Sequence, residues 1–235
     1  MDLLKQLAAV MVLGVLGLAG CGGGAMVGGA VAGLSRGESD SLNAQHSRFE
    51  SGEDAALTAE THFAAGQLAE SQGGVQMAIR QYRQAVKLDS HHVKSLYRLG
   101  VVHAQVEAYG EAIAAWRAYL KETGEDAGAY ANLGFCYELA GEAANAEAAY
   151  KQGIAKDGKN GPCRVNYGLM LARAGRGNEA MIQFQAVLTE AQAHYNIGSV
   201  YEQMGKKAEA KAEYRKAVEL DPGLGEAKSR LAGVE

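Results

Sequence analysis

A glycine followed twelve residues later by an alanine occurs five times in this 235-residue chain. The five glycines lie 34, 34, 34 and 30 residues apart, which indicates a repeating unit rather than one globular core. The flanking segments are rich in Ala, Leu and Glu, and the whole chain contains only two prolines, so long helices are expected. The pairs are Gly66 and Ala78, Gly100 and Ala112, Gly134 and Ala146, Gly168 and Ala180, and Gly198 and Ala210.

The period divides the chain into five units, 59–92, 93–126, 127–160, 161–190 and 191–224. Counted from the start of each unit, position 8 is always glycine, position 20 is always alanine, and position 24 is always aromatic. The fifth unit contains HYNIGSVYEQMGKKAEAKAEYRKAVELDP and resembles the tetratricopeptide repeat, a helix–turn–helix unit of 34 residues. The resemblance implies an all-α fold over 58–235, namely a right-handed superhelical solenoid of antiparallel helix pairs, with a capping helix over 225–235.

Position 8 lies inside the first helix of each unit, where glycine costs about 1 kcal/mol relative to alanine. We interpret it as the point where the two helices cross, so that Gly134 faces Ala146 and the backbones approach closely. Gly141 and its equivalents at position 15 are predicted to close the turn in a left-handed conformation. Unit two has Glu107 there, which predicts a different turn. Unit four lacks four residues after Leu188, which predicts a changed angle for unit five.

The N-terminus has the layout of a secretory signal. Lys5 precedes an apolar run that is too short to span a membrane, and small residues then lead to Cys21. Leu18-Ala19-Gly20-Cys21 resembles the lipobox of bacterial lipoproteins. This resemblance implies a signal peptide over 1–20 and a Cys21 that carries acyl chains such as palmitate. An uncleaved signal anchor with an incidental cysteine is the alternative.

The segment 21–57 is rich in Gly, Ser and acidic residues and is predicted to be a flexible tether behind the lipidated N-terminus. A lipid anchor places the chain in the cell envelope. Gly22 stands where an aspartate would favour the inner membrane of enteric bacteria, so the outer membrane facing the periplasm is the expected location.

In the tetratricopeptide family, first helices line a concave groove, chiefly through positions 2, 5, 6, 9, 12 and 13. The resemblance therefore implies a peptide- or protein-binding groove formed by Lys94, Tyr97, Arg98, Val101, Asn132, Phe135, Leu139, Val165, Asn166, Leu169, Tyr195 and Asn196. Its centre would be an apolar stripe, and its asparagines at position 6 could hold the backbone of an extended peptide. Two alternatives stay open. The apolar side chains pack against neighbouring helices instead of forming a binding stripe, and asparagine is simply common at this position in the family, without a role in peptide binding.

Lys94 and Arg98 resemble half of a clamp that holds the C-terminal carboxylate of a peptide in some family members. The other half requires asparagine at position 6 of unit one, where this chain has Ala64. The two cations could still attract an acidic partner.

Several function classes find no support in the sequence. The net charge of −4 is not the basic excess expected of a nucleic-acid-binding protein. The six histidines show no metal-ligand spacing. No arrangement for catalysis, cofactor binding or a small-molecule substrate is recognisable, so we do not expect an enzyme. Helical rise separates Cys136 and Cys163 by about 10 Å along the axis, too far for a disulfide, and both are predicted to be buried thiols.

These features predict a non-catalytic scaffold, anchored by lipid in the cell envelope, that binds envelope proteins or peptides in its groove. Anchor, size and repeat number are similar to those of lipoproteins that assemble tight-adherence and type IV pili. An adaptor in outer-membrane protein assembly or cell-wall remodelling is the alternative. A regulatory subunit of an envelope enzyme is an alternative of another class.

Overall fold

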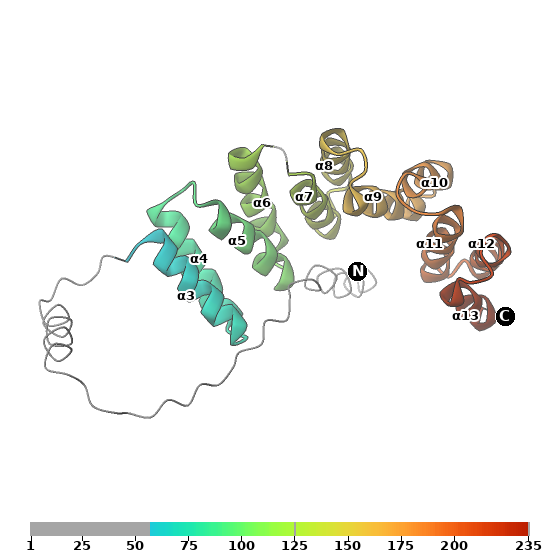
Figure 1. Ribbon diagram of the computed structural model, residues 1–235, viewed down its shortest axis with the longest axis horizontal. Coiled ribbons are helices and arrows are strands. Elements are labelled where there is room, and N and C mark those ends of the chain that lie inside the picture. Colours follow the sequence, from blue (N-terminus) through green and yellow to red (C-terminus); the bar gives the residue numbers. More distant parts are fainter. Residues whose placement is uncertain (1–56, 125, 235) are drawn as a thin grey trace, which may run out of the picture.

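The computed structural model describes residues 57–124 and 126–234, which form eleven α-helices and no strand. The expected all-α fold, with helix pairs packed in series, is confirmed (Figure 1). The predicted signal peptide, Cys21 and all but the last residue of the tether lie outside the described residues.

Each unit contributes two helices. The first helices are α3 (Ala59–Ser71), α5 (Val93–Gln105), α7 (Ala127–Leu139), α9 (Gly161–Arg173) and α11 (Glu190–Gln203). The second helices are α4 (Val75–Leu88), α6 (Tyr109–Thr123), α8 (Ala143–Lys156), α10 (Gly177–Gln185) and α12 (Lys207–Leu220). A last helix, α13 (Gly225–Gly233), packs against α12.

Each first helix packs against the second helix of its own unit and, from unit two onward, against the second helix of the unit before. The pairs therefore form a curved row (Figure 1). From unit three onward, α8, α10 and α12 lie on the outer side of the arc, and α7, α9 and α11 lie on the inner side. A row of this kind presents one face made largely of first helices and another made largely of second helices.

Side-chain caps fix where most first helices begin. Thr58, Asp126, Asn160 and Thr189 each accept a hydrogen bond from the backbone N–H three residues on. Such a cap stabilises a helix by about 1 kcal/mol because it satisfies a donor that the first turn leaves free. Pro162 lies in the first turn of α9, where its missing N–H costs nothing.

The aromatic residue at position 24 explains the glycine at position 8. A Cβ atom added to Gly134 would lie 2.5 Å from the Tyr150 ring, and one added to Gly168 would lie 2.6 Å from the Phe184 ring. Gly66, Gly100 and Gly198 likewise meet the rings of Tyr82, Trp116 and Tyr214. All five rings are buried, at no more than 1% exposure.

The partner predicted for these glycines from the repeat pattern is therefore wrong. They make room for a flat ring that passes over the first helix, not for the alanine at position 20. Only at Gly198 is an atom of that alanine, the Ala210 carbonyl oxygen, among the three nearest to the added Cβ, at 3.3 Å. The alanines themselves are fully buried.

Four of the five rings belong to three apolar clusters along the row. One contains Phe63 and Tyr82, the next contains Trp116 and Leu133, and the third contains Tyr150, Phe184 and Leu171. Cys136 and Cys163 are buried free thiols, as the helical spacing predicted. The Cys163 thiol donates a hydrogen bond to the Ala127 carbonyl oxygen at 3.1 Å.

The turn between the two helices has the same form in every unit. Gly73, Gly141, Gly175 and Gly205 have φ angles of 74–80°, as expected for a left-handed helix cap. The expectation of a different turn in unit two was wrong, since Glu107 takes the same conformation with φ 60°. The Ala108 N–H donates to the His103 carbonyl at 2.9 Å, matching the bond at the other four turns.

Glu107 is thus a side-chain-bearing residue in a conformation that glycine adopts without strain. We expect Glu107→Gly to raise the free energy of unfolding by about 0.5–1 kcal/mol, because relief of left-handed strain exceeds the added entropy of the unfolded chain. Urea unfolding followed by circular dichroism measures the change. Gly141→Ala is the reciprocal variant and should be destabilising by a similar amount; a stabilising Gly141→Ala would contradict the assignment.

The shortening of unit four begins earlier than the sequence argument placed it. Helix α10 has 9 residues, against 14 in α4, α8 and α12, and it ends at Gln185 rather than beyond Leu188. The Leu188 N–H closes a single turn onto the Phe184 carbonyl, and Thr189 already caps α11. The helix stops because the chain must reach the Thr189 cap within three residues. The changed angle of unit five stays a prediction.

Candidate protein-binding surface

The predicted groove residues all lie on the first helices α5, α7, α9 and α11, and most are half-buried. Lys94 is exposed, whereas Asn166 is buried, at 7% exposure. No large apolar side chain of the predicted stripe is among the strongly exposed ones of the described chain. The inner face therefore offers partial, not full, access to these side chains.

Part of the predicted apolar stripe belongs to the core. Tyr97 packs edge-on against Trp116 and Tyr119, with ring centroids 5.1 and 5.5 Å away. Val101 packs on the same cluster, and Val165 and Leu169 pack on the cluster of Tyr150 and Phe184. Phe135 and Leu139 on α7 are half-buried and belong to none of the three clusters. Of the predicted stripe, these two residues are the ones that do not pack on a core cluster.

The two predicted cations on α5 are not free. The Lys94 ammonium lies 3.0 Å from Glu60, and the Arg98 guanidinium binds Glu70 through two hydrogen bonds, one of them 3.1 Å from Nε. Both carboxylates belong to unit one. These contacts join neighbouring units and neutralise the charge that was expected to attract an acidic partner.

The asparagines at position 6 differ in their contacts. The Asn196 amide donates to the Gln192 carbonyl of its own helix at 2.9 Å. By contrast, the side-chain amides of Asn132 and Asn166 make no hydrogen bond to any described residue. Asn132 on α7 and Asn166 on α9 occupy the same position on successive first helices. An amide that is half or fully buried without a partner favours a ligand that supplies one.

A recurring polar contact lies beside this face, and sequence analysis missed it. The tyrosine hydroxyl at position 24 donates to a glutamate at position 12 of the same unit, and an arginine of the next unit, or of α13 after unit five, pairs with that carboxylate. We call this contact the carboxylate link. It consists of Glu70, Tyr82 and Arg98; of Glu138, Tyr150 and Arg173; and of Glu202, Tyr214 and Arg230.

The link of unit three is the most buried. Tyr150 donates to Glu138 at 2.6 Å, and the Arg173 guanidinium lies 2.5 Å from the other carboxylate oxygen. Burial and then the Glu138 charge raise the pKa of Tyr150 well above its ordinary value, so the phenol stays a donor. Burial, and then the hydrogen bond to Glu70, raise the pKa of Tyr82 to about 12.

Units two and four cannot form the link. They carry Ala104 and Ala172 at position 12, and Trp116 and Phe184 at position 24. Glutamate thus occurs at position 12 only where position 24 is tyrosine. That correlation is visible in the sequence and would have predicted the link.

His103, at position 11 of unit two, is a buried titratable group, and its Nδ1 has no hydrogen-bond partner. Burial, and then the charge of Arg83, lower the pKa of His103, although Glu111 opposes the shift. Above about pH 6.5 the histidine is neutral in both the folded and the unfolded chain. Below that value the unfolded chain binds the proton more readily, so the free energy of unfolding falls with falling pH.

We expect His103→Leu to remove this part of the pH dependence, since Leu171 occupies the same position in unit four. Urea unfolding of both proteins at about pH 8 and about pH 5 tests it. The wild-type chain should lose more stability on acidification than the variant does. Equal losses would show that His103 is not responsible.

The described residues contain no cluster of His, Cys, Asp and Glu that could hold a metal ion. Within the same residues, no helix has the length and apolar character needed to cross a bilayer.

Comparisons with known proteins agree with this architecture. Residues 63–127 and 191–224 each match a family model described as tetratricopeptide repeat. The fold is that of a tetratricopeptide-repeat solenoid. Such repeats generally serve as protein-interaction scaffolds and are typically not catalytic. No curated protein sequence matches the chain.

Solved structures of similar fold include a MamA protein, with 24% identity and a TM-score of 0.59 over 68% of this chain and 90% of that one. YrrB, described as a repeat protein with an unusual peptide-binding site, has 24% identity and a TM-score of 0.55 over 79% of this chain and 96% of its own. A thermophilic repeat protein from Thermus thermophilus has 19% identity and a TM-score of 0.51 over 75% of this chain and 98% of its own. At these identities the likeness establishes the fold alone.

Proposed function

We propose that this protein is a non-catalytic scaffold that binds an extended segment of another protein on the inner face of α7 and α9. The observation that carries the proposal is the pair of unpartnered amides, Asn132 and Asn166, at equivalent positions on successive helices. Each can donate to and accept from a peptide backbone of any sequence. Phe135 and Leu139 lie beside Asn132 on α7 and supply apolar contact area. The peptide-binding site of YrrB supports the same use of the fold.

A photo-reactive residue in place of Phe135 tests the proposal in cells. It should crosslink to a defined segment of a partner protein, which can then be synthesised as a labelled peptide. The same residue in place of Ile182, an exposed side chain on α10, is the matched control and should not trap that segment. Asn132→Ala with Phe135→Ala should weaken binding of the purified peptide by about tenfold, since one amide pair and one aromatic contact are lost. Unchanged affinity would refute the inner-face site.

The second half of the proposal is the place of action. The lipobox-like Leu18-Ala19-Gly20-Cys21 supports a lipid anchor, and an anchored scaffold would act at the outer membrane on the periplasmic side. Assembly of a pilus or secretion apparatus is the favoured pathway, with an adaptor role in outer-membrane protein assembly as the alternative. The identity of the crosslinked partner separates the two.

The anchor makes its own prediction. Cys21→Ala should abolish labelling with radioactive palmitate, because the thiol that is acylated is gone. The chain should also lose its stable membrane anchor, which requires two or more acyl chains. Processing at the lipobox should stop as well, which leaves a longer chain on a gel. A variant that is still labelled and still processed would exclude Cys21 as the lipidation site.

A further inference from the structure

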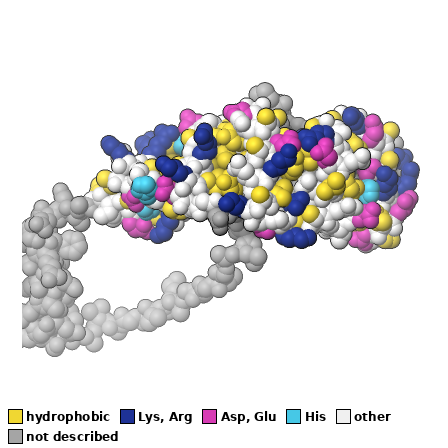
Figure 2. Space-filling view, turned by 90° about the horizontal axis from the view of Figure 1, so that it is seen from above, with side chains coloured by type: hydrophobic (Ala, Val, Ile, Leu, Met, Phe, Trp, Pro, Cys, Tyr) yellow, Lys and Arg dark blue, Asp and Glu magenta, His cyan; other side chains and the backbone are white. Residues whose placement is uncertain are grey.

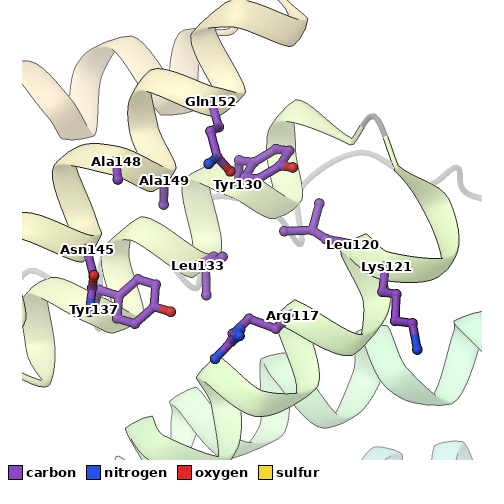
Figure 3. Close-up of a pocket in the computed structure, with 10 residues that line it drawn as sticks. All are labelled: Arg117, Leu120, Lys121, Tyr130, Leu133, Tyr137, Asn145, Ala148, Ala149 and Gln152. Carbon is purple, nitrogen blue, oxygen red and sulfur yellow. The ribbon is translucent and has the colours of Figure 1, made fainter.

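A cavity of about 550 Å³ lies between α6, α7 and α8, where units two and three meet (Figure 3). Its walls come from one stretch of each helix, and none of the predicted groove residues lines it. A volume of this size lies within the range of ordinary ligand sites. Seen from the side of α8 and α10, hydrophobic patches are interspersed with Lys and Arg (Figure 2).

We propose that this cavity is a second binding site, separate from the inner face, that accepts an acidic segment of a protein partner. The first reason is its charge. Arg117 and Lys121 lie one turn apart on α6 and both line the cavity, while none of the lining residues is acidic. Neither cation makes an ion pair or hydrogen bond with another described residue. This contrasts with Lys94 and Arg98, whose charges are neutralised by unit one.

The second reason is a set of further unpartnered polar groups in the lining. The hydroxyls of Tyr130 and Tyr137 and the amide of Gln152 also line the cavity without a hydrogen bond to any described residue. Figure 3 shows these groups around one opening, with Arg117 on the facing helix. Arginine binds a carboxylate through two parallel hydrogen bonds, and a neighbouring hydroxyl or amide can satisfy its remaining lone pairs.

The third reason is that the lining has an apolar part, which favours a peptide over a free ion as the occupant. Leu120 and Leu133 form an apolar part of the lining, and the small side chain of Ala148 lines it from α8. A segment that alternates carboxylates with aliphatic side chains satisfies both parts of the surface. The chain as a whole carries a net charge of −4, so it does not attract acidic peptides in general. Binding of such a peptide must therefore be local.

The test uses detergent-solubilised full-length protein and a fluorescein-labelled hexapeptide that alternates glutamate and leucine. Fluorescence anisotropy at low ionic strength should show it binding about tenfold more tightly than a peptide with glutamine in place of glutamate. Arg117→Glu with Lys121→Glu should weaken binding by at least about tenfold. Ala148→Phe should weaken it similarly by filling the cavity, without any change of charge.

The matched control is Arg83→Glu with Lys87→Glu on α4. These residues occupy the same repeat positions in unit one and change the net charge by the same amount, away from the cavity. This variant should alter the affinity by less than about twofold. The proposal fails if the acidic peptide does not bind, if both charge-reversal variants lose equal affinity, or if Ala148→Phe has no effect. It also fails if Asn132→Ala with Phe135→Ala abolishes binding, which would place the peptide on the inner face.

Discussion

Gly134→Ala should lower the free energy of unfolding by about 2 kcal/mol, although alanine is the better helix former by about 1 kcal/mol. The new methyl group would lie 2.5 Å from the Tyr150 ring, which is completely buried and cannot move aside without disturbing its own cluster. Thermal and urea unfolding followed by circular dichroism give the difference.

A double variant decides which neighbour the glycine serves. With Tyr150→Leu already present, the ring is gone and Gly134→Ala should become neutral or stabilising. If glycine instead made room for Ala146, as the sequence argument held, the cost would persist in the double variant. A coupling energy close to zero between the two sites would therefore overturn the structural explanation.

Arg173→Met should lower the free energy of unfolding by about 3 kcal/mol, more than Gly134→Ala does, because it leaves the Glu138 carboxylate without its cation. The Glu138 side chain is 7% exposed and that of Arg173 is 21% exposed, so water replaces little of the lost contact. Arg176→Met is the matched control: its side chain is 37% exposed, and its loss should cost less than about 1 kcal/mol. Urea unfolding measures both.

Removal of the whole carboxylate link should lower the free energy of unfolding by less than removal of the arginine alone. Glu138→Ala, Tyr150→Phe and Arg173→Met together reproduce the Ala172 and Phe184 chemistry of unit four, in which no buried charge remains. We expect this triple variant to be more stable than Arg173→Met by itself. A triple variant less stable than the single one would show that the link contributes net stability beyond avoiding an unpaired charge.

The repeat period predicted much of the architecture. Glycines at position 15 identify the turns because few other residues adopt a positive φ at low cost, and the structure gives them that conformation. Glu107 shows the limit of the rule, since the geometry of the surrounding helices holds a non-glycine residue in the same turn. The length of α10 was misjudged because a helix end depends on the cap that follows, and Thr189 was not recognised as one.

The candidate site was harder to foresee. Repeat positions predict which helix face a side chain occupies, and the predicted groove residues do lie on first helices. They do not predict partners in the next unit, so the pairing of Arg98 with Glu70 was missed. Nor do they show that Tyr97 packs edge-on against Trp116. The cavity between α6, α7 and α8 depends on how far apart these helices lie, which no local sequence pattern encodes.

The alternation of the carboxylate link along the row has a mechanical consequence. Units one, three and five are each joined to the next unit or, after unit five, to α13 through a partly buried carboxylate, whereas units two and four, with Ala104 and Ala172, lack this link. Under tension, the row should separate first between units two and three and between units four and five. The other joints should stay intact. A scaffold that flexes at set places can match bound surfaces of unequal curvature without unfolding any of its helix pairs.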